Sequence, residues 1–207
     1  MKTILIGGGG HALSLMEILT DIGQLEGYAD LRPNPLMPIA YLGTDEEIQS
    51  KYSPEEFDIH VTFVYTSEVS LQPRRCIIER YKQYHSHTFC ALSALVTTQS
   101  VLDEGCAVME KAVVNRSQIG KNTVINTGAI IEHGCEIGDN CFIGPGATIC
   151  GGVSIGENTF IGAGTVVRDE VSIAPACIIG MGSLVTSDIT EAGVYYGRPA
   201  KIKKRVF

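Results

Sequence analysis

The second half of the chain follows a strict period of six residues. Fifteen consecutive hexads run from Val101 to Thr190, and each begins with a small or medium-sized apolar residue. Neither an α-helix, with about 3.6 residues per turn, nor an alternating strand has this period. A period of six is typical of a parallel β-helix, in which each hexad makes one flat side and one corner of a coil. Three hexads close a triangular coil, so the fifteen hexads predict five coils.

The first residue of each hexad is expected to point into the prism and to stack on the residues three hexads before and after it. These residues are Val101, Ala107, Val113, Ile119, Ile125, Ile131, Ile137, Ile143, Ile149, Ile155, Ile161, Val167, Ile173, Ile179 and Val185. The fifth residue of a hexad is usually small, which lets the chain turn a corner without overfilling a narrow core. The hexads therefore predict a solenoid in which each coil is stabilised by its neighbours.

The composition narrows the possible partners and the compartment. The chain has 207 residues and a formal net charge of −7, which argues against a role in nucleic-acid binding or at a membrane surface. No apolar run approaches the roughly 20 residues of a membrane span, and the glycines that follow Ile6 come too early for a signal peptide. We therefore expect a cytoplasmic protein without membrane insertion.

The cysteines indicate packing rather than cross-linking. The chain has seven of them, no CxxC motif occurs, and Cys135, Cys141 and Cys177 occupy the small fifth place of a hexad. Cysteines of this kind are typically small buried residues in a reducing compartment. The pattern predicts neither a disulfide framework nor a metal site.

The N-terminus has the pattern of a phosphate-binding unit. An apolar strand over Lys2–Ile6 is followed by a glycine turn, Gly7–Ala12, and then by a predicted helix over Leu13–Ile22. Without side chains, the N–H groups of such a turn can approach an anion at the N-terminus of the helix. Asp30 follows about 20 residues later, where a ribose or a base would be bound. A glycine turn without any ligand is the alternative.

Further elements complete a small first domain. Two more strands are predicted over Ile39–Leu42 and His60–Tyr65, and a helix over Leu71–Tyr84. We divide the chain into a Rossmann-like domain of residues 1–95, a β-helix of residues 96–190 and a tail of residues 191–207. The first domain is too short for a complete dinucleotide fold. A nucleotide-sugar or another nucleoside diphosphate therefore suits it better than NAD.

One histidine stands out in the repeat. His133 is the only histidine of the prism, and it occupies the third place of its hexad, where the ring can point outward from a rigid wall. Histidine titrates near neutral pH and is a natural general base. A rigid mount is what a positioned base requires.

Four segments together resemble one known family. They are Ile6–Ala12, Tyr28–Asp30, Asn126–His133 and Tyr196–Lys201. They resemble the glycine turn, the acidic segment, the catalytic stretch and the C-terminal motif of sugar acyltransferases of the sialic-acid O-acetyltransferase type. This family includes PglD-type N-acetyltransferases of nucleotide-linked 4-amino sugars. The resemblance implies an α/β Rossmann-like half-domain followed by an all-β left-handed parallel β-helix.

The resemblance also implies ligands, an assembly and site residues. It implies a homotrimer with acetyl-CoA between neighbouring prisms, no metal, and a nucleotide-linked amino sugar held by the first domain. His133 would be the catalytic base, with Asn115 and Asn126 behind it. The residues expected to bind the nucleotide-sugar are Gly8, Gly9, Gly10, His11 and Asp30, and those expected to bind acetyl-CoA are Phe142, Gly151, Ala163, Gly180 and Met181.

Three positions depart from the family pattern. Gly134 replaces the acid that usually follows the histidine, Phe142 replaces a second histidine, and Leu31 replaces a second acid. Asn115 precedes His133 by three hexads, so we expect it one coil away in the same column, within reach of the ring. With Phe142 unable to donate a hydrogen bond, the N–H group of Gly151 is expected to polarise the acetyl carbonyl.

The sequence thus predicts an acetyl-CoA-dependent N-acetyltransferase that acts on a UDP-type 4-amino sugar for bacterial surface glycans. His133 would remove the proton while the amine attacks the thioester directly. Two alternatives stay open: O-acetylation of sialic acid or a related sugar, and a non-catalytic nucleotide-binding trimer, which Gly134 and Phe142 suggest.

Overall fold

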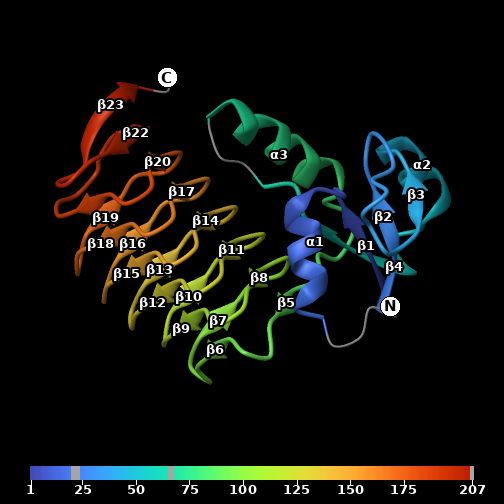
Figure 1. Ribbon diagram of the computed structural model, residues 1–207, viewed down its shortest axis with the longest axis horizontal. Coiled ribbons are helices and arrows are strands. Elements are labelled where there is room, and N and C mark those ends of the chain that lie inside the picture. The colour runs from blue at the N-terminus through green and yellow to red at the C-terminus, as the bar shows by residue number, and fades with distance from the viewer. Residues whose placement is uncertain (20–23, 65–67, 206–207) are drawn as a thin grey trace.

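The computed structural model describes residues 1–19, 24–64 and 68–205, and Figure 1 shows an N-terminal α/β domain beside the first coils of a long β-helix. The α/β domain has a parallel four-stranded sheet in the order β3-β2-β1-β4. Its strands are β1 (Lys2–Ile6), β2 (Leu25–Ala29), β3 (Tyr41–Gly43) and β4 (Phe57–Val61), and its helices are α1 (Gly10–Glu17), α2 (Asp45–Lys51) and α3 (Glu68–Arg80).

Alternation along β1 explains how the helices cover this sheet. Leu5 packs in one apolar cluster with α1, whereas Ile4 and Ile6 pack in another with Ile48 of α2 and with Tyr81, which follows α3. Successive side chains of a strand point to opposite faces. The sheet is therefore buried on both faces, as is usual for parallel strands.

The predicted elements of this domain are present with shifted limits. The strand expected from His60 begins at Phe57, because Phe57 and Asp58 pair with Lys2 and Thr3 of β1. The helix expected over 71–84 ends at Arg80. Helix α2 was not predicted, although its capping box between Thr44 and Glu47 is a sequence signal. The end of the helix expected over 13–22 lies partly outside the described residues.

The prism has three faces, each a parallel sheet of short strands. The eight-stranded face carries the α/β domain, and we call it the covered face. Its strands are β5 (Phe89–Cys90), β8 (Ala107–Val108), β11 (Val124–Ile125), β14 (Phe142–Ile143), β17 (Phe160–Ile161), β20 (Ile178–Ile179), β22 (Gly193–Tyr196) and β23 (Lys201–Arg205). Only β23, which pairs with β22, runs antiparallel.

The other two faces differ in the residues that point outward. The apolar face consists of β6 (Leu95–Val96), β9 (Val113–Val114), β12 (Ile130–Ile131), β15 (Thr148–Ile149), β18 (Val166–Val167) and β21 (Leu184–Val185). The polar face consists of β7 (Val101–Leu102), β10 (Gln118–Ile119), β13 (Glu136–Ile137), β16 (Ser154–Ile155) and β19 (Ser172–Ile173). From Ile119 onward, the first residue of each predicted hexad is buried in one continuous core, as expected.

The phase of the first three predicted hexads is wrong by one residue. Val101 is 53% exposed, whereas Val108 and Val114, rather than Ala107 and Val113, belong to the core of the prism. The cause is a short corner: Val113 pairs with Ile130 and Ile130 pairs with Thr148, so the first of these coils is one residue shorter than the second. Each early strand has two adjacent apolar residues, so the sequence pattern fits either phase.

The small residues at the corners also form hydrogen bonds between successive coils. Thr123 donates its hydroxyl hydrogen to the carbonyl of Gly138 at 2.9 Å, and Thr165 donates to Gly180 at 3.1 Å. The thiol of Cys135 donates in the same way to the carbonyl of Cys150 at 3.1 Å. Cys135, Cys141 and Cys177 are free and buried, as predicted. These donors link successive coils where backbone carbonyls would otherwise be buried without a partner.

The coil begins at β5, which already pairs with β8, and the last residues add β22 and β23 to the covered face. The limits 1–95, 96–190 and 191–207 stay predictions. None of the helices in the described part of the chain combines the length and the apolar character that a bilayer crossing requires.

Candidate active site

His133 lies at the corner where the apolar face meets the polar face, between β12 and β13. The side chain is exposed, and it lines a hollow of about 490 Å³ together with Asn115, Arg116 and Gly134. Its ring lies against Gly151, one coil further on: a Cβ atom at Gly151 would be 2.8 Å from Cε1 and 3.0 Å from Nε2 of the ring. The predicted outward projection from a rigid corner is therefore present.

Gly134 has a backbone reason to be glycine. Its φ is +71°, in the left-handed region, and Gly152 and Glu170 occupy the matching place of the next two coils at φ +69° and +60°. Glycine takes this conformation without steric cost, whereas other residues take it rarely. The residue that replaces the family's acid thus suits the corner, but it supplies no carboxylate to the ring.

Asn115 does not reach His133. Its Nδ2 donates to Oε2 of Glu132 at 3.1 Å. The short corner explains this correction, because a coil that is one residue short places Glu132, rather than His133, beside Asn115 in the next coil. The position of Asn115 in the column was therefore predicted incorrectly, although it lines the same hollow as His133.

Asn126 lies at a different corner from His133. It follows β11, where the covered face meets the apolar face, and its Oδ1 accepts the N–H of Thr127 at 2.7 Å. The side chain of Asn126 is therefore bonded within its own corner. Within one chain Asn126 does not contact His133, because the two residues flank β12 at opposite edges of the apolar face.

The residues expected to bind acetyl-CoA fall into three places. Ala163, Gly180 and Met181 share the corner between the covered and apolar faces, which we call the Met181 corner; the Met181 side chain is 82% exposed there. Gly151 lies at the His133 corner. Phe142 is only 8% exposed on the covered face, where its ring stacks on Phe160 at 5.0 Å between centroids. One chain therefore does not bring all five together.

The N–H group of Gly151 is not free in this structure. It donates to Oδ1 of Asp169 at 3.2 Å. The expectation that this group polarises an acetyl carbonyl therefore needs correction: the aspartate one coil further on already accepts from it.

A basic hairpin lies beside the Met181 corner. Lys201 and Lys203 belong to β23, and the ammonium group of Lys203 lies 5.1 Å from the centroid of the Tyr196 ring. Tyr196 is itself half exposed, and its Cβ atom covers Gly180. This arrangement offers an anion two exposed cations beside an exposed aromatic ring.

The glycine turn of the α/β domain is tied to the acidic segment. The N–H group of Gly8 donates to Oδ2 of Asp30 at 2.8 Å, and the carbonyl of Gly8 accepts from Nδ2 of Asn34 at 2.7 Å. Gly9 caps α1, and a Cβ atom at Gly9 or Gly10 would meet nothing within 4 Å. The structure thus brings the predicted residues Gly8 and Asp30 together, and adds Asn34, which the sequence did not suggest.

A hollow of about 250 Å³ opens at the carboxyl ends of β1 and β2. Its lining includes Gly7, Asp30 and Leu31, with Phe63 and Asp45 from the neighbouring segments. Ligands of parallel α/β sheets bind at this edge. The hydroxyl of Tyr81 donates to Asp45, and burial raises the pKa of that phenol first, with the bond to Asp45 adding to it.

Two histidines, the buried His60 and the partly buried His11, lie between the α/β domain and the prism. Burial, and secondly the charge of Arg74, lowers the pKa of His11 to about 4, and burial lowers the pKa of His60 to about 3. Both rings are therefore neutral at pH 7, and neither Nε2 atom has a hydrogen-bond partner. His11, which was predicted to bind the nucleotide-sugar, faces this buried layer.

Arg74 joins the two domains, and no sequence pattern indicated it. Its side chain is 2% exposed; Nε donates to Oδ1 of Asn140 at 2.6 Å, and one NH2 group donates to the carbonyl of Asn122 at 2.8 Å. The other NH2 group donates to the carbonyl of Phe63. A further bond goes to the carbonyl of Val61, so a residue of α3 links the end of β4 to two successive coils of the prism.

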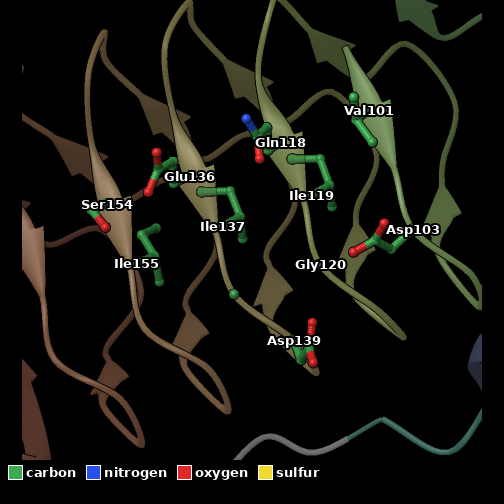
Figure 2. A pocket seen from close by; sticks show the side chains of 11 residues that line it. Val101, Asp103, Gln118, Ile119, Gly120, Glu136, Ile137, Asp139, Ser154 and Ile155 are labelled. Carbon is green, nitrogen blue, oxygen red and sulfur yellow. The ribbon is translucent and has the colours of Figure 1, made fainter.

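A groove of about 340 Å³ lies on the polar face. Side chains of β10, β13 and β16 line it (Figure 2). Gln118, Glu136 and Ser154 point outward from these strands, and Asp103 and Asp139 lie near its edge. Three carboxylates make this groove unfavourable for a phosphate. In residues 1–19, 24–64 and 68–205, no group of three or more metal-ligating side chains is placed to hold a metal ion.

Comparisons with known proteins agree with this architecture. The family model "Bacterial transferase hexapeptide (six repeats)" matches residues 116–151, and "Hexapeptide repeat of succinyl-transferase" matches residues 136–169 and 152–187. No curated protein sequence gives a significant match.

Solved structures match over almost the whole chain. The acetyltransferase domain of PglB from Neisseria gonorrhoeae FA1090 has 27% identity and a TM-score of 0.88, with 98% of this chain and 99% of that chain covered. A histidine-to-asparagine mutant of perosamine N-acetyltransferase from Caulobacter crescentus, in complex with CoA and GDP-perosamine, has 30% identity and a TM-score of 0.88, with 98% and 97% covered. WeeI from Acinetobacter baumannii AYE, at 20% identity, supports the fold alone, with a TM-score of 0.79 and 98% and 99% covered.

The fold and the exposed corner histidine define a transferase built on hexapeptide repeats. On the likeness to perosamine N-acetyltransferase, the chain belongs to the hexapeptide-repeat sugar N-acetyltransferases. This confirms the predicted family, the left-handed β-helix with its α/β domain, and an acyltransferase activity. Acetyl-CoA as the acyl donor is confirmed as well, because related structures hold acetyl-CoA or CoA.

Proposed function

We propose that this protein acetylates the amino group of a nucleotide-linked 4-amino sugar from acetyl-CoA, with His133 as the general base, during the synthesis of a bacterial surface glycan. The observation that carries the proposal is the exposed imidazole of His133 on a rigid corner, at the edge of an apolar face. In support, a related enzyme was solved with CoA and GDP-perosamine as histidine-to-asparagine and histidine-to-alanine mutants.

The active form is a homotrimer in this proposal. The residues that point outward from the apolar face are Leu95, Val113, Ile130, Thr148, Val166 and Leu184. All are at least partly exposed in the single chain, and Leu95 is 59% exposed. A partly exposed strip in which five of six outward residues are apolar is typical of a protein interface. Further copies of the same chain would cover it, as closed symmetry requires equivalent contacts on each copy.

Such a trimer assembles the site from two chains. The His133 corner and the Met181 corner are the two edges of the apolar face. When three apolar faces surround one axis, the His133 corner of each chain approaches the Met181 corner of the next. Acetyl-CoA would then lie in the groove between them, its phosphates near Lys201 and Lys203 of the basic hairpin. The separation of the site residues within one chain has this physical explanation.

The chemistry follows from the position of the imidazole. The neutral ring of His133 accepts a proton from the sugar amine as the nitrogen attacks the thioester carbonyl. The tetrahedral intermediate collapses to the amide, and CoA leaves as a thiolate that takes up the proton from the imidazolium of His133, which restores the base. General-base assistance of this kind contributes about 10²- to 10⁴-fold to the rate. No covalent intermediate on the protein is needed.

The nucleotide part would bind at the glycine turn. Gly9 and Gly10 have open space beside their Cα atoms at the N-terminus of α1, where backbone N–H groups favour a phosphate. Asp30 is at the rim of the adjoining hollow, where a base or ribose has room. We propose the cytoplasm as the compartment, since the seven free cysteines suit a reducing environment.

The test measures release of the CoA thiol with UDP- and GDP-linked 4-amino sugars, and with sialic acid as an acceptor that offers hydroxyl groups. We expect amine acceptors to be used, and His133→Ala to lower kcat at least about tenfold with the trimer intact. His85→Ala, which removes another exposed histidine far from the corner, is the matched control. Transfer only to sialic acid favours O-acetylation; UDP binding without any transfer favours a non-catalytic trimer.

A further inference from the structure

The ring of His133 has an unusual support. A Cβ atom at Gly151 would lie 2.8 Å from Cε1, 3.0 Å from Nε2 and 3.4 Å from Nδ1 of the imidazole. The ring therefore lies across the bare Cα of Gly151, at a distance that no side chain at this position permits. Gly151 is itself buried, whereas the histidine above it is exposed.

The backbone does not require glycine at this position. Gly134 and Gly152 have φ values of +71° and +69°, but Gly151 is outside the left-handed region. An alanine at Gly151 would fit the backbone conformation, and the atoms it meets are those of one exposed side chain. The three atoms nearest to a Cβ at this position all belong to the imidazole, which gives the absence of a side chain a direct explanation.

The position of Gly151 is held from the other side. Its N–H group donates to Oδ1 of Asp169 at 3.2 Å, and its carbonyl accepts from the N–H of Glu170 at 2.9 Å. His133, Gly151 and Asp169 follow one another at intervals of one coil in the same column. The bond that Gly151 donates to Asp169 therefore holds the peptide on which the ring lies.

Other supports for the ring are missing nearby. Gly134 has no side chain, and the amide of Asn115 is bonded to Glu132. In the described ranges 1–19, 24–64 and 68–205, no hydrogen bond to a ring nitrogen of His133 is found. The contact that the structure does give the ring is the close approach to the bare Cα of Gly151.

We propose that Gly151 is a positioning residue for the acetyl transfer, and that Asp169 supports it by holding its peptide. The inference rests on the proposed role of His133. A methyl group at Gly151 turns the imidazole away from the wall while the coil stays folded. Misplacement of a catalytic group by about 1 Å lowers a rate by about a hundredfold.

The experiment compares Gly151→Ala with wild type, in the His133 and in the His133→Ala background. We expect Gly151→Ala to lower kcat about ten- to a hundredfold with a small change in the KM of the sugar nucleotide, and to have no further effect once His133 is alanine. A loss of the same size in both backgrounds, or full activity of Gly151→Ala, would overturn the proposal. The double-mutant comparison separates action through the ring from contact with acetyl-CoA.

A second measurement does not depend on activity. The imidazole signal of His133, assigned by its absence in His133→Ala, is followed by NMR in the Gly151→Ala and Asp169→Ala trimers. We expect a clear change of its chemical shift in Gly151→Ala and a smaller change in Asp169→Ala. An unmoved signal contradicts the positioning role. If His133→Ala retains full turnover while the signal moves, the contact is real and the proposed general base is wrong.

Discussion

The prism and the α/β domain place their polar groups in opposite ways. In the prism, corner hydroxyls and thiols bond the next coil, and the ring of His133 stays exposed on the wall. In the α/β domain, the N–H of Gly8 is bonded to Asp30, and His11, His60 and Arg74 are turned toward the prism.

This difference teaches how the two halves serve one reaction. In the proposed mechanism, the wall of the prism carries the base at a rigid corner before any ligand arrives, which is what pre-organised catalysis needs. The glycine turn has satisfied part of its own hydrogen bonding, so a nucleotide has to replace the bond between Gly8 and Asp30 or bind beside it. We therefore expect substitutions at the wall of the prism to change kcat, and substitutions in the glycine turn to change the affinity for the substrate.

The largest effect is expected from a charge on the apolar face. Val166→Glu places a carboxylate in the middle of the proposed interface, where burial without a partner is strongly unfavourable. We expect monomers by light scattering and loss of turnover by more than about a hundredfold, since the two corners no longer meet. Ser172→Glu, on the polar face, is the control and should remain trimeric. A trimeric, active Val166→Glu would remove the apolar face from the interface.

The second prediction concerns Arg74, which joins the α/β domain to the prism. Arg74→Leu leaves the carbonyls of Asn122 and Phe63 and the amide of Asn140 without this donor in a buried layer. Hydrogen bonds from a charged group contribute roughly 1.5 to 3 kcal/mol each. We expect the free energy of unfolding to fall by about 3 kcal/mol or more, measured by urea denaturation. Arg75→Leu, at an exposed neighbouring position, should change it little.

Acidification should destabilise the protein through the contact between the two regions. The pKa of His11 is lowered to about 4 and that of His60 to about 3, against 6.5 in an unfolded chain, so between pH 6.5 and 4 the unfolded state binds more protons. The stabilisation from these neutral rings is complete above pH 6.5 and is lost as the pH falls, by about 3 kcal/mol for His11 and about 5 kcal/mol for His60.

Urea unfolding of wild type and of His60→Gln, at pH 7 and at pH 4.5, checks this expectation. The variant should lose less stability on acidification than the wild type. Equal losses would show that His60 is not kept neutral by the contact between the domains.

The smallest effect is expected at the glycine turn. Asp30→Ala removes the acceptor of the Gly8 N–H and a polar group of the adjoining hollow. We expect the KM of the sugar nucleotide to rise about tenfold while kcat changes less, in steady-state kinetics. Asp30→Asn keeps an acceptor, so its KM for the sugar nucleotide should lie between those of the wild type and of Asp30→Ala. A fall in kcat with an unchanged KM would contradict a binding role.

Much of this architecture could be predicted from the residues. The period of six indicated the prism, because a repeated coil contacts only its neighbours and carries its packing rule in each hexad. The same rule placed His133 outward. The rule gave the wrong phase from Val101 to Val114, because adjacent apolar pairs conceal a corner that is one residue short. As a result, Asn115 was expected beside His133, whereas it lies beside Glu132.

The sequence by itself determined the repeat, the strand-turn-helix unit at the N-terminus and the family, since these depend on local spacing. Only the tertiary structure decided that Arg74 joins the domains, that Asn126 and His133 lie at different corners, and that Gly151 supports the imidazole. Those relations join residues brought together by coiling and domain packing. Their geometry depends on the length of every corner between them, which no single motif contains.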